Sequence, residues 1–198
     1  MREFIVTGHE VPTAPDFSLD DITGGAGRLD VLSRCVTAAL LLSHDIREDV
    51  RVRLVFRDAI TVRFEGSRLR RLNPDERSTA ALIRDALADR EEAVGRRAAE
   101  TSPGVLVSRL GFKSTLADAA DGGTVVHLDQ SGEPVADVPV PADPVFVLSD
   151  HVEFTDRETK LVDEAATETV RLGPESLHAD QAITVAHNYL DTEGFRQY

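Results

Sequence analysis

The sequence predicts an α/β protein in which helices cover a mostly parallel sheet. Short apolar or alternating segments typical of strands recur along the chain, and segments with helical periodicity lie between them. In the last third the two kinds alternate strictly, which is the pattern of layered parallel sheets. With 198 residues, 41% of them hydrophobic, the chain is long enough for one substantial core, so residues 1–198 are expected to form a single domain.

The N-terminal part begins with a strand and a long loop. Residues 2–9, REFIVTGH, form a short apolar run typical of a strand. Residues 11–28 are rich in proline, glycine and aspartate and predict a loop, and loops of this length are usually functional or disordered. Apolar residues at helical spacing predict a helix over residues 29–42, with Asp30 near its positive end.

Two strands and a second helix are expected next. Residues 50–57 and 59–66 alternate apolar and charged side chains, which predicts half-buried strands joined by a turn near Asp58. Asn73 has the spacing of a helix cap, with Pro74 at the first helical position. Residues 89–102 are charged and rich in alanine, and the pattern leaves open a continuation of this helix or a solvated excursion.

The remaining sequence alternates strands with helices. VLVSRLG and TVVHLDQSG predict strands on either side of a short helix near residues 114–120, and GEPVADVP predicts a loop. PVFVLSD, TDRETKLVDEAA, TVRLG and ADQAITVAHNYLD then predict strand, helix, strand and helix. Thr155 is the expected cap of the first of these helices.

Composition argues against several classes of protein. No run of 18 apolar residues is present, and the N-terminus turns polar too early for a signal peptide, so a soluble, cytoplasmic protein with no membrane partner is expected. The single cysteine, Cys35, rules out an internal disulfide and is expected to be a buried, inert thiol. None of the six histidines has the spacing of metal ligands, so no metal is expected.

The net charge of −13 argues against nucleic acid as a partner until the basic residues are considered separately. Acidic residues are spread along the whole chain, and this strong self-repulsion is typical of halophile proteins, because high salt screens it. We interpret the acidity as adaptation to a salty cytoplasm. All the basic residues except Lys113 and Lys160 are arginines, whose forked donors suit bidentate recognition of phosphate.

Three loops that follow predicted strands indicate a small-molecule site, at residues 128–132, 148–151 and 172–177. The carboxyl ends of parallel strands form a ligand crevice, where backbone groups bind a polar heterocycle and leucines cover its faces. The chain has neither a Walker lysine motif nor GxGxxG, which favours an adenine-containing cofactor without a critical phosphate. The alternative is that Gly173 and Pro174 merely end a strand.

Four stretches carry a resemblance to a known family: GRLDVLSRCV, RRLNPDERSTAALI, FVLSDH and TVRLGPESLHADQAITVAHNYLD. In order and spacing they resemble the archaeal SPOUT-class methyltransferases that methylate N1 of pseudouridine in the T-loop of tRNA, the TrmY family. The resemblance implies the SPOUT methyltransferase fold with a C-terminal trefoil knot, in a cofactor-binding part of about residues 122–198. It also implies S-adenosyl-L-methionine as cofactor, bound in a bent conformation, and a homodimer.

The resemblance assigns cofactor-binding residues position by position. They are Leu128, Ser149, Leu172, Gly173, Pro174, Glu175, Ser176, Leu177 and Ala182. In the family the position of Ser149 is typically glycine and that of Ala182 is typically cysteine. These departures argue against a thiol nucleophile and question any role that needs a glycine dihedral.

For the acceptor base, the resemblance implies that Arg28 and Asp30 are catalytic. Pseudouridine is a C-glycoside, so its N1 carries a hydrogen that must leave when a methyl group arrives. A carboxylate that accepts this N–H orients the ring or assists the proton's departure, and an arginine stabilises negative charge on the neighbouring carbonyl oxygen. The structural alternative is that Asp30 only stabilises the start of its helix.

Arginines are the candidates for contact with the RNA backbone, because a base inside a folded loop must be held by its phosphates and flipped out. The candidate residues are Arg34, Arg63, Arg68, Arg70, Arg71 and Arg77. Two alternatives stay open: Arg34 pairs with Asp30, four residues before it, and the others form a solvated face balanced by Asp75 and Glu76.

The sequence therefore predicts a homodimeric S-adenosyl-L-methionine-dependent methyltransferase that acts on N1 of pseudouridine 54 in the T-loop of tRNA. Two rivals stay open. One is a ribosomal RNA pseudouridine N1-methyltransferase, whose larger insertions are not evident in this chain. The other is a non-catalytic RNA-binding dimer that retains the knot.

Overall fold

The computed structural model describes residues 1–198 and contains one eight-stranded sheet. Its strands are β1 (Arg2–Gly8), β2 (Val50–Phe56), β3 (Ile60–Glu65), β4 (Ala99–Ser102), β5 (Val105–Ser108), β6 (Thr124–Pro134), β7 (Pro144–Ser149) and β8 (Glu168–Arg171), in the order β4-β5-β3-β2-β1-β7-β6-β8. Strands β2, β1, β7, β6 and β8 are parallel, and β3, β5 and β4 continue the sheet in antiparallel pairs. The predicted α/β class with a mostly parallel sheet is confirmed.

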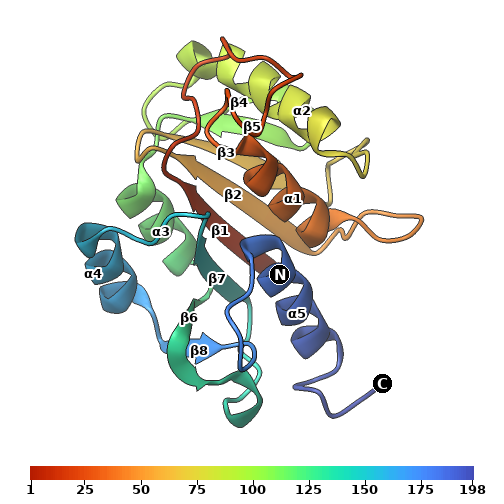
Figure 1. Ribbon diagram of the computed structural model, residues 1–198, viewed down its shortest axis with the longest axis vertical. Helices are drawn as coiled ribbons and strands as arrows, with labels where there is room; N and C mark the ends of the chain where they lie inside the picture. The colour runs from red at the N-terminus through yellow and green to blue at the C-terminus, as the bar shows by residue number, and fades with distance from the viewer.

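Helices lie on both faces of the sheet (Figure 1). One face is covered by α1 (Leu29–Leu40), α2 (Glu76–Ala88) and α5 (Ala179–Asp191), and the other by α3 (Phe112–Ala120) and α4 (Asp156–Ala165). Two short 3-10 helices, η1 (Arg90–Glu92) and η2 (Val135–Asp137), lie in the connections. The sheet is therefore the middle layer of three.

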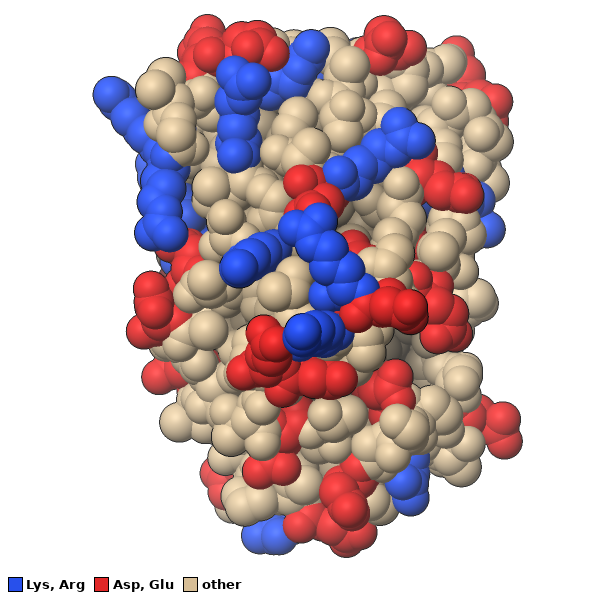
Figure 2. Space-filling view, turned by 90° about the vertical axis from the view of Figure 1, so that its left-hand side faces the viewer, with Lys and Arg blue, Asp and Glu red and all other residues tan.

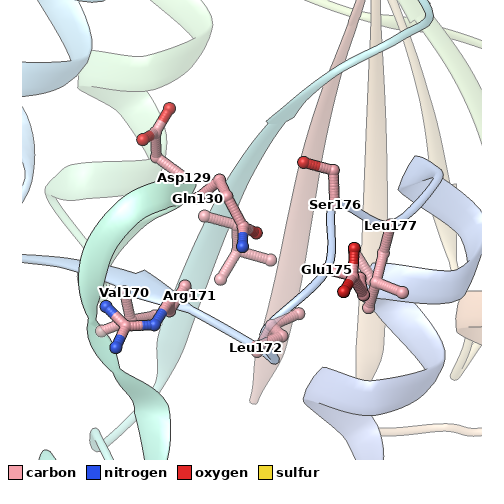
Figure 3. A pocket seen from close by; sticks show the side chains of 10 residues that line it. Asp129, Gln130, Val170, Arg171, Leu172, Glu175, Ser176 and Leu177 are labelled. Carbon is pink, nitrogen blue, oxygen red and sulfur yellow. The ribbon is translucent and has the colours of Figure 1, made fainter.

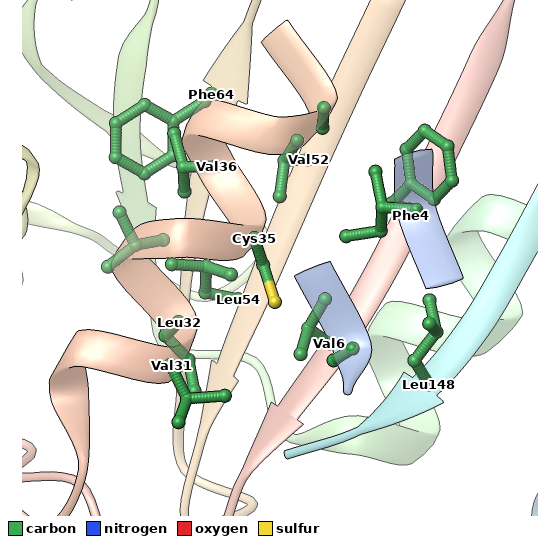
Figure 4. Packing of buried hydrophobic residues seen from close by; sticks show 14 of the residues in the cluster. Phe4, Val6, Val31, Leu32, Cys35, Val36, Val52, Leu54, Phe64 and Leu148 are labelled. Carbon is green, nitrogen blue, oxygen red and sulfur yellow. The ribbon is translucent and has the colours of Figure 1, made fainter. Parts of the chain in front are cut away.

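Alternation along the strands explains why there is a core on each side of the sheet. In β1, Phe4 and Val6 belong to the larger core with α1, α2 and α5, whereas Ile5 belongs to the smaller core with α3 and α4. Figure 4 shows Cys35 of α1 pointing into the larger core, toward Val6 and Leu54. Its side chain has no solvent exposure, and burial raises the pKa of the thiol, so the prediction of a buried, inert cysteine is confirmed.

Three local predictions were wrong. The cap of α2 is Asp75, not Asn73, because the Asp75 carboxylate accepts a 2.7 Å hydrogen bond from the backbone of Ser78. Residues 89–102 contain η1 and then β4, an edge strand that is neither a continued helix nor a purely solvated excursion. Part of the predicted loop GEPVADVP belongs to β6, which continues to Pro134.

Strand β8 lies against two separate parts of β6. Val170 is paired with Leu128 and also with Glu133, because the segment between these two residues curves around β8 (Figure 1). At the curve, a Cβ on Gly132 would lie 2.6 Å from the backbone of Thr169, so only glycine permits this approach. The Arg171 guanidinium donates to the Gly132 carbonyl at 2.6 Å and fixes the two segments together.

Candidate functional site

The three loops proposed to bind a cofactor meet in one cleft at the carboxyl ends of β6, β7 and β8. The cleft consists of two adjoining hollows of about 110 and 240 Å³. Both are lined by Leu128, Asp129, Gln130, Ser176, Leu177 and Ala182. Of the predicted cofactor residues, those that line the cleft are Leu128, Ser149, Leu172, Glu175, Ser176, Leu177 and Ala182. Figure 3 shows Gln130, from β6, facing the hollow together with Leu172 and Leu177, from the segment after β8.

Gly173 and Pro174 are outside the lining but hold the third loop in place. Their carbonyl oxygens accept hydrogen bonds of 3.4 and 2.9 Å from the amide of Gln130, which joins the third loop to the first. A side chain at Gly173 would meet no atom within 4 Å, and the residue does not have a positive φ. The turn therefore has no steric need for glycine at this position.

The two departures from the family pattern are compatible with this cleft. Ser149 is the last residue of β7 and has no positive φ, so its position needs no glycine dihedral. Its hydroxyl donates to the carbonyl oxygen of Val152 and closes the turn that follows the strand. Ala182 is buried on α5 at the bottom of the cleft and offers a small apolar surface.

The lining fits an amphipathic ligand. Leu128, Leu148 and Leu172 supply apolar surface, and Leu177 leaves 40% of its surface exposed beside the hollow. In the first turn of α5, one buried carboxylate oxygen of Asp180, Oδ1, has no hydrogen-bond partner. Asp180 is not in the lining of the cleft, and the apolar lining itself matches a ligand with a flat, largely apolar ring.

Arg28 and Asp30 form a two-pronged ion pair at the start of α1. Arg28 Nε lies 3.0 Å from Asp30 Oδ1, and Arg28 Nη2 lies 3.2 Å from Asp30 Oδ2. Arg28 is the N-cap residue and has a left-handed backbone with φ of 63°, a conformation that costs energy for a residue with a Cβ. The backbone is thus held in an unfavourable conformation where the two predicted catalytic residues meet.

A second arginine also binds the Asp30 carboxylate. Arg34 Nη1 donates to Asp30 Oδ2 at 2.8 Å, so of the two alternatives for Arg34 the structure shows the pairing with Asp30. Burial raises the pKa of Asp30, but hydrogen bonds from Arg28 and Arg34 outweigh it and hold the pKa below its ordinary value. Asp30 is therefore ionised at neutral pH and is a weak proton acceptor.

Sequence reasoning missed Asp180, which links this ion pair to the cleft. Arg34 Nε lies 3.7 Å from Asp180 Oδ2. Asp180 follows Ala179 in the chain, and Ala179 lines the cleft. Arg34 thus connects the candidate base-binding residues with the candidate cofactor site. No local signal identifies this contact, because the two residues lie on helices at opposite ends of the sequence.

A partly buried histidine clamp, formed by His9 and also missed from the sequence, supports the second loop of the cleft. His9 Nδ1 lies 3.0 Å from Asp150 Oδ1, and His9 Nε2 lies 3.0 Å from Glu158 Oε2. A neutral imidazole has one N–H, so hydrogen bonds to both carboxylates require the imidazolium form. Burial lowers the pKa of His9, but these bonds outweigh it and raise the pKa above its usual value.

The other arginines proposed to contact RNA do not form one surface. Arg68 pairs with Glu100 at 2.7 Å, and Arg77 pairs with Asp20. Arg70 and Arg71 line a separate hollow beyond the end of α1. Arg63 lies apart from them, because alternation along β3 places it on the face of the sheet that α3 covers.

Comparisons with known proteins agree with this architecture. Residues 1–195 match the model of a family described as "Putative SAM-dependent RNA methyltransferase". The chain belongs to this family. The match confirms the resemblance to SAM-dependent RNA methyltransferases that the sequence analysis found.

Members of this RNA methyltransferase family include close relatives of the chain. A protein from Haloferax volcanii is 68% identical over 198 residues, and one from Haloarcula marismortui is 63% identical, each over the full length of both chains. Both are named tRNA (pseudouridine(54)-N(1))-methyltransferase.

A solved structure supports the fold. Archaeoglobus fulgidus Nep1 bound to S-adenosylhomocysteine superposes with a TM-score of 0.65 at 15% sequence identity, covering 96% of this chain and 97% of that chain. In the present structure no helix has the length and apolar character needed to cross a membrane. No group of three or more His, Cys, Asp or Glu side chains is arranged to hold a metal ion.

Proposed function

We propose that the protein transfers a methyl group from S-adenosyl-L-methionine to N1 of pseudouridine 54 in the T-loop of tRNA. The observation that carries this proposal is the 68% identity, over the whole of both chains, to a protein named for that activity. The cleft and the Arg28–Asp30 pair support it, because they combine a site for an amphipathic cofactor with charged groups suited to a heterocyclic base.

The cleft is the proposed cofactor site. Leu128, Leu172 and Leu177 would cover the faces of the adenine ring, and backbone groups of the three loops would bind its edge. When bound, S-adenosyl-L-methionine supplies an electrophilic methyl group on its sulfonium.

Asp30 and Arg28 are the proposed groups for the base. Asp30 Oδ2 accepts from both Arg28 and Arg34, whereas Oδ1 accepts from Arg28 alone and keeps a lone pair for the N1–H of pseudouridine. Because its pKa is low, Asp30 orients the ring while the proton passes to water as the N1–methyl bond forms. Arg28 stabilises the negative charge on the adjacent carbonyl oxygen.

The trefoil knot, the homodimer and the cytoplasmic location belong to the same proposal. The double pairing of Val170, with Leu128 and Glu133, supports a knot in which β8 is threaded through the preceding segment. The homodimer and the cytoplasmic location rest on the family resemblance. Light scattering coupled to size-exclusion chromatography tests the dimer.

Analysis of tRNA from a strain that lacks the gene tests the proposed function. Mass spectrometry of the nucleosides is expected to show pseudouridine in place of 1-methylpseudouridine at position 54, with the methyl group restored by the wild-type gene. Loss of a methyl group from ribosomal RNA alone would support the first rival. No change in either RNA would favour the non-catalytic dimer.

A further inference from the structure

A second, positively charged pocket lies on the other face of the sheet, between α3 and strands β2, β3 and β5. Its cavity volume is about 100 Å³. The charged residues in its lining are Arg53, Arg63, Arg96 and Asp118. The register of β2 and β3 places Arg53 directly opposite Arg63, so both guanidinium groups project from the same face.

Carboxylates pair with two of the three arginines in the lining and leave the third, Arg96, unpaired. Arg53 is almost completely buried and is paired with Glu3 and Asp118. Arg63 has only Glu65 as partner, at 2.9 Å, and the same Glu65 oxygen also pairs with Arg51 at 2.9 Å. Arg96 has no carboxylate within 4.0 Å.

A small excess of positive charge remains at this place. Arg51, Arg53, Arg63 and Arg96 are accompanied by three carboxylates, Glu3, Glu65 and Asp118, which leaves a net charge of +1 in a chain whose total is −13. Burial and the nearby charges of Arg51 and Arg53 lower the pKa of Arg63, as expected for a cation that lacks enough negative charge around it. The buried Arg63 Nε lies 2.9 Å from Glu65 Oε1, an oxygen that Arg63 shares with Arg51. An anion in the pocket would supply the missing negative charge.

We propose that this pocket binds a phosphate group, supplied by the backbone of the substrate RNA. Guanidinium groups present forked donors that match phosphate oxygens, and the free Ser114 hydroxyl at the rim adds a further donor. The assignment of the phosphate to RNA rests on the proposed function, whereas the binding of a phosphate group by the pocket is independent of it.

The position of the pocket relative to the cofactor cleft suits an RNA backbone. One row of paired residues crosses the sheet from the cleft to the pocket. It runs from Ser149 of β7, which lines the cleft, through Thr7 of β1 and Val55 of β2 to Thr61 of β3, which lines the pocket. The two ends of this row are three strand spacings apart, a distance of about 14 Å. A base held in the cleft and a phosphate held in the pocket would therefore lie a few nucleotides apart on one strand of RNA.

Basic side chains gather on this side of the molecule. Figure 2 shows most of its Lys and Arg side chains in the middle and upper parts of this face, with carboxylates at the top, at the sides and in the lower part. In Figure 1 the helix α3, which borders the pocket, lies at middle height on the same side. Two of the strands that form the cleft, β6 and β8, lie below α3 in Figure 1, so a strand of RNA that passes the pocket on its way to the cleft would meet these arginines first.

Titration with inorganic phosphate, in chloride salt that keeps the protein folded, tests the pocket without RNA or cofactor. Arg96→Gln changes an exposed, unpaired residue, so the fold is retained, and Arg63→Gln is the second variant. Loss of one charged hydrogen bond is expected to weaken phosphate binding about tenfold in each. Arg196→Gln, an exposed arginine near the C-terminus, is the matched control and is expected to bind like the wild type.

Steady-state methylation of tRNA distinguishes the two sources of phosphate. Arg96→Gln is expected to raise KM for tRNA about tenfold with kcat unchanged, and Arg196→Gln to change neither. Weaker phosphate binding with an unchanged KM would mean that the site takes free phosphate, and would overturn the assignment to RNA. Equal phosphate binding by wild type and Arg96→Gln would overturn the pocket itself, whether or not tRNA is methylated.

Discussion

Arg34 binds the carboxylate of Asp30 across one turn of α1, with 2.8 Å between Nη1 and Oδ2. The same guanidinium lies 3.7 Å from Asp180 in the first turn of α5. One arginine thus fixes the residue proposed to orient the base and reaches the helix that borders the cofactor cleft. Binding of the base and binding of the cofactor are therefore expected to depend on the same side chain.

Replacing Asp30 tests the assignment of the base-binding group. Asp30→Asn keeps the size of the side chain but removes the charge that accepts N1–H, so turnover is expected to fall about 100-fold or more. Affinity for S-adenosyl-L-methionine, measured by calorimetry, is expected to stay the same. An unchanged single-turnover rate on tRNA that contains pseudouridine would end this assignment.

Truncation of Leu177 tests the cofactor cleft. Because Leu177 is 40% exposed, Leu177→Ala is expected to change the free energy of unfolding by less than about 1 kcal/mol. Loss of its contact with the adenine ring is expected to weaken cofactor binding about tenfold, which calorimetry measures. Leu42, 45% exposed and outside the cleft, provides the matched control Leu42→Ala. Equal cofactor affinity of the two variants would argue against the cleft.

The histidine clamp predicts a pH dependence of stability. The folded state raises the pKa of His9 above its unfolded value, so the clamp's stabilisation is complete below the unfolded pKa, about 6.5, and is lost as pH rises through the folded pKa. His9→Gln is expected to remove this dependence and to cost about 1.5–3 kcal/mol at pH 6. The exposed His44 offers the control His44→Gln, measured by urea unfolding across pH 5 to 9. Identical pH profiles for wild type and His9→Gln would contradict the clamp.

The acidic composition predicts a requirement for salt. The chain has a net charge of −13, and its carboxylates repel one another more strongly as screening by salt weakens. The Debye length grows from about 3 Å at 1 M salt to about 30 Å at 0.01 M. We expect the circular-dichroism signal of the fold to disappear at low ionic strength and to be retained in molar salt. A full signal without added salt would count against halophilic adaptation.

Local patterns predicted most of the fold because the deciding interactions are local. Thr155 was predicted to cap α4 and forms a complete capping box with Glu158, three residues later. The cap of α2 was misplaced because Asn73 and Asp75 are both good caps, and only the bond to Ser78 decides between them. Strand β4 was missed because its four residues at the edge of the sheet are mostly polar and only partly buried.

The site was predictable only where the chain brings residues together locally or where the family resemblance supplied them. The Arg28–Asp30 pair spans two residues and was predicted. The contacts of His9 with Asp150 and of Arg34 with Asp180 join residues more than 140 positions apart, which no local spacing reveals. The separation of Arg63 from the other arginines follows from the alternation of β3, once its register is known.

The central claim is that this site methylates N1 of pseudouridine 54. The most direct measurement incubates the purified protein with S-adenosyl-L-methionine and two transcripts of one tRNA, with pseudouridine or uridine at position 54, and analyses the nucleosides by mass spectrometry. The proposed function predicts 1-methylpseudouridine at position 54 of the first transcript and no methyl group on the second. Absence of 1-methylpseudouridine from the first transcript, with a folded and cofactor-bound protein, would contradict it.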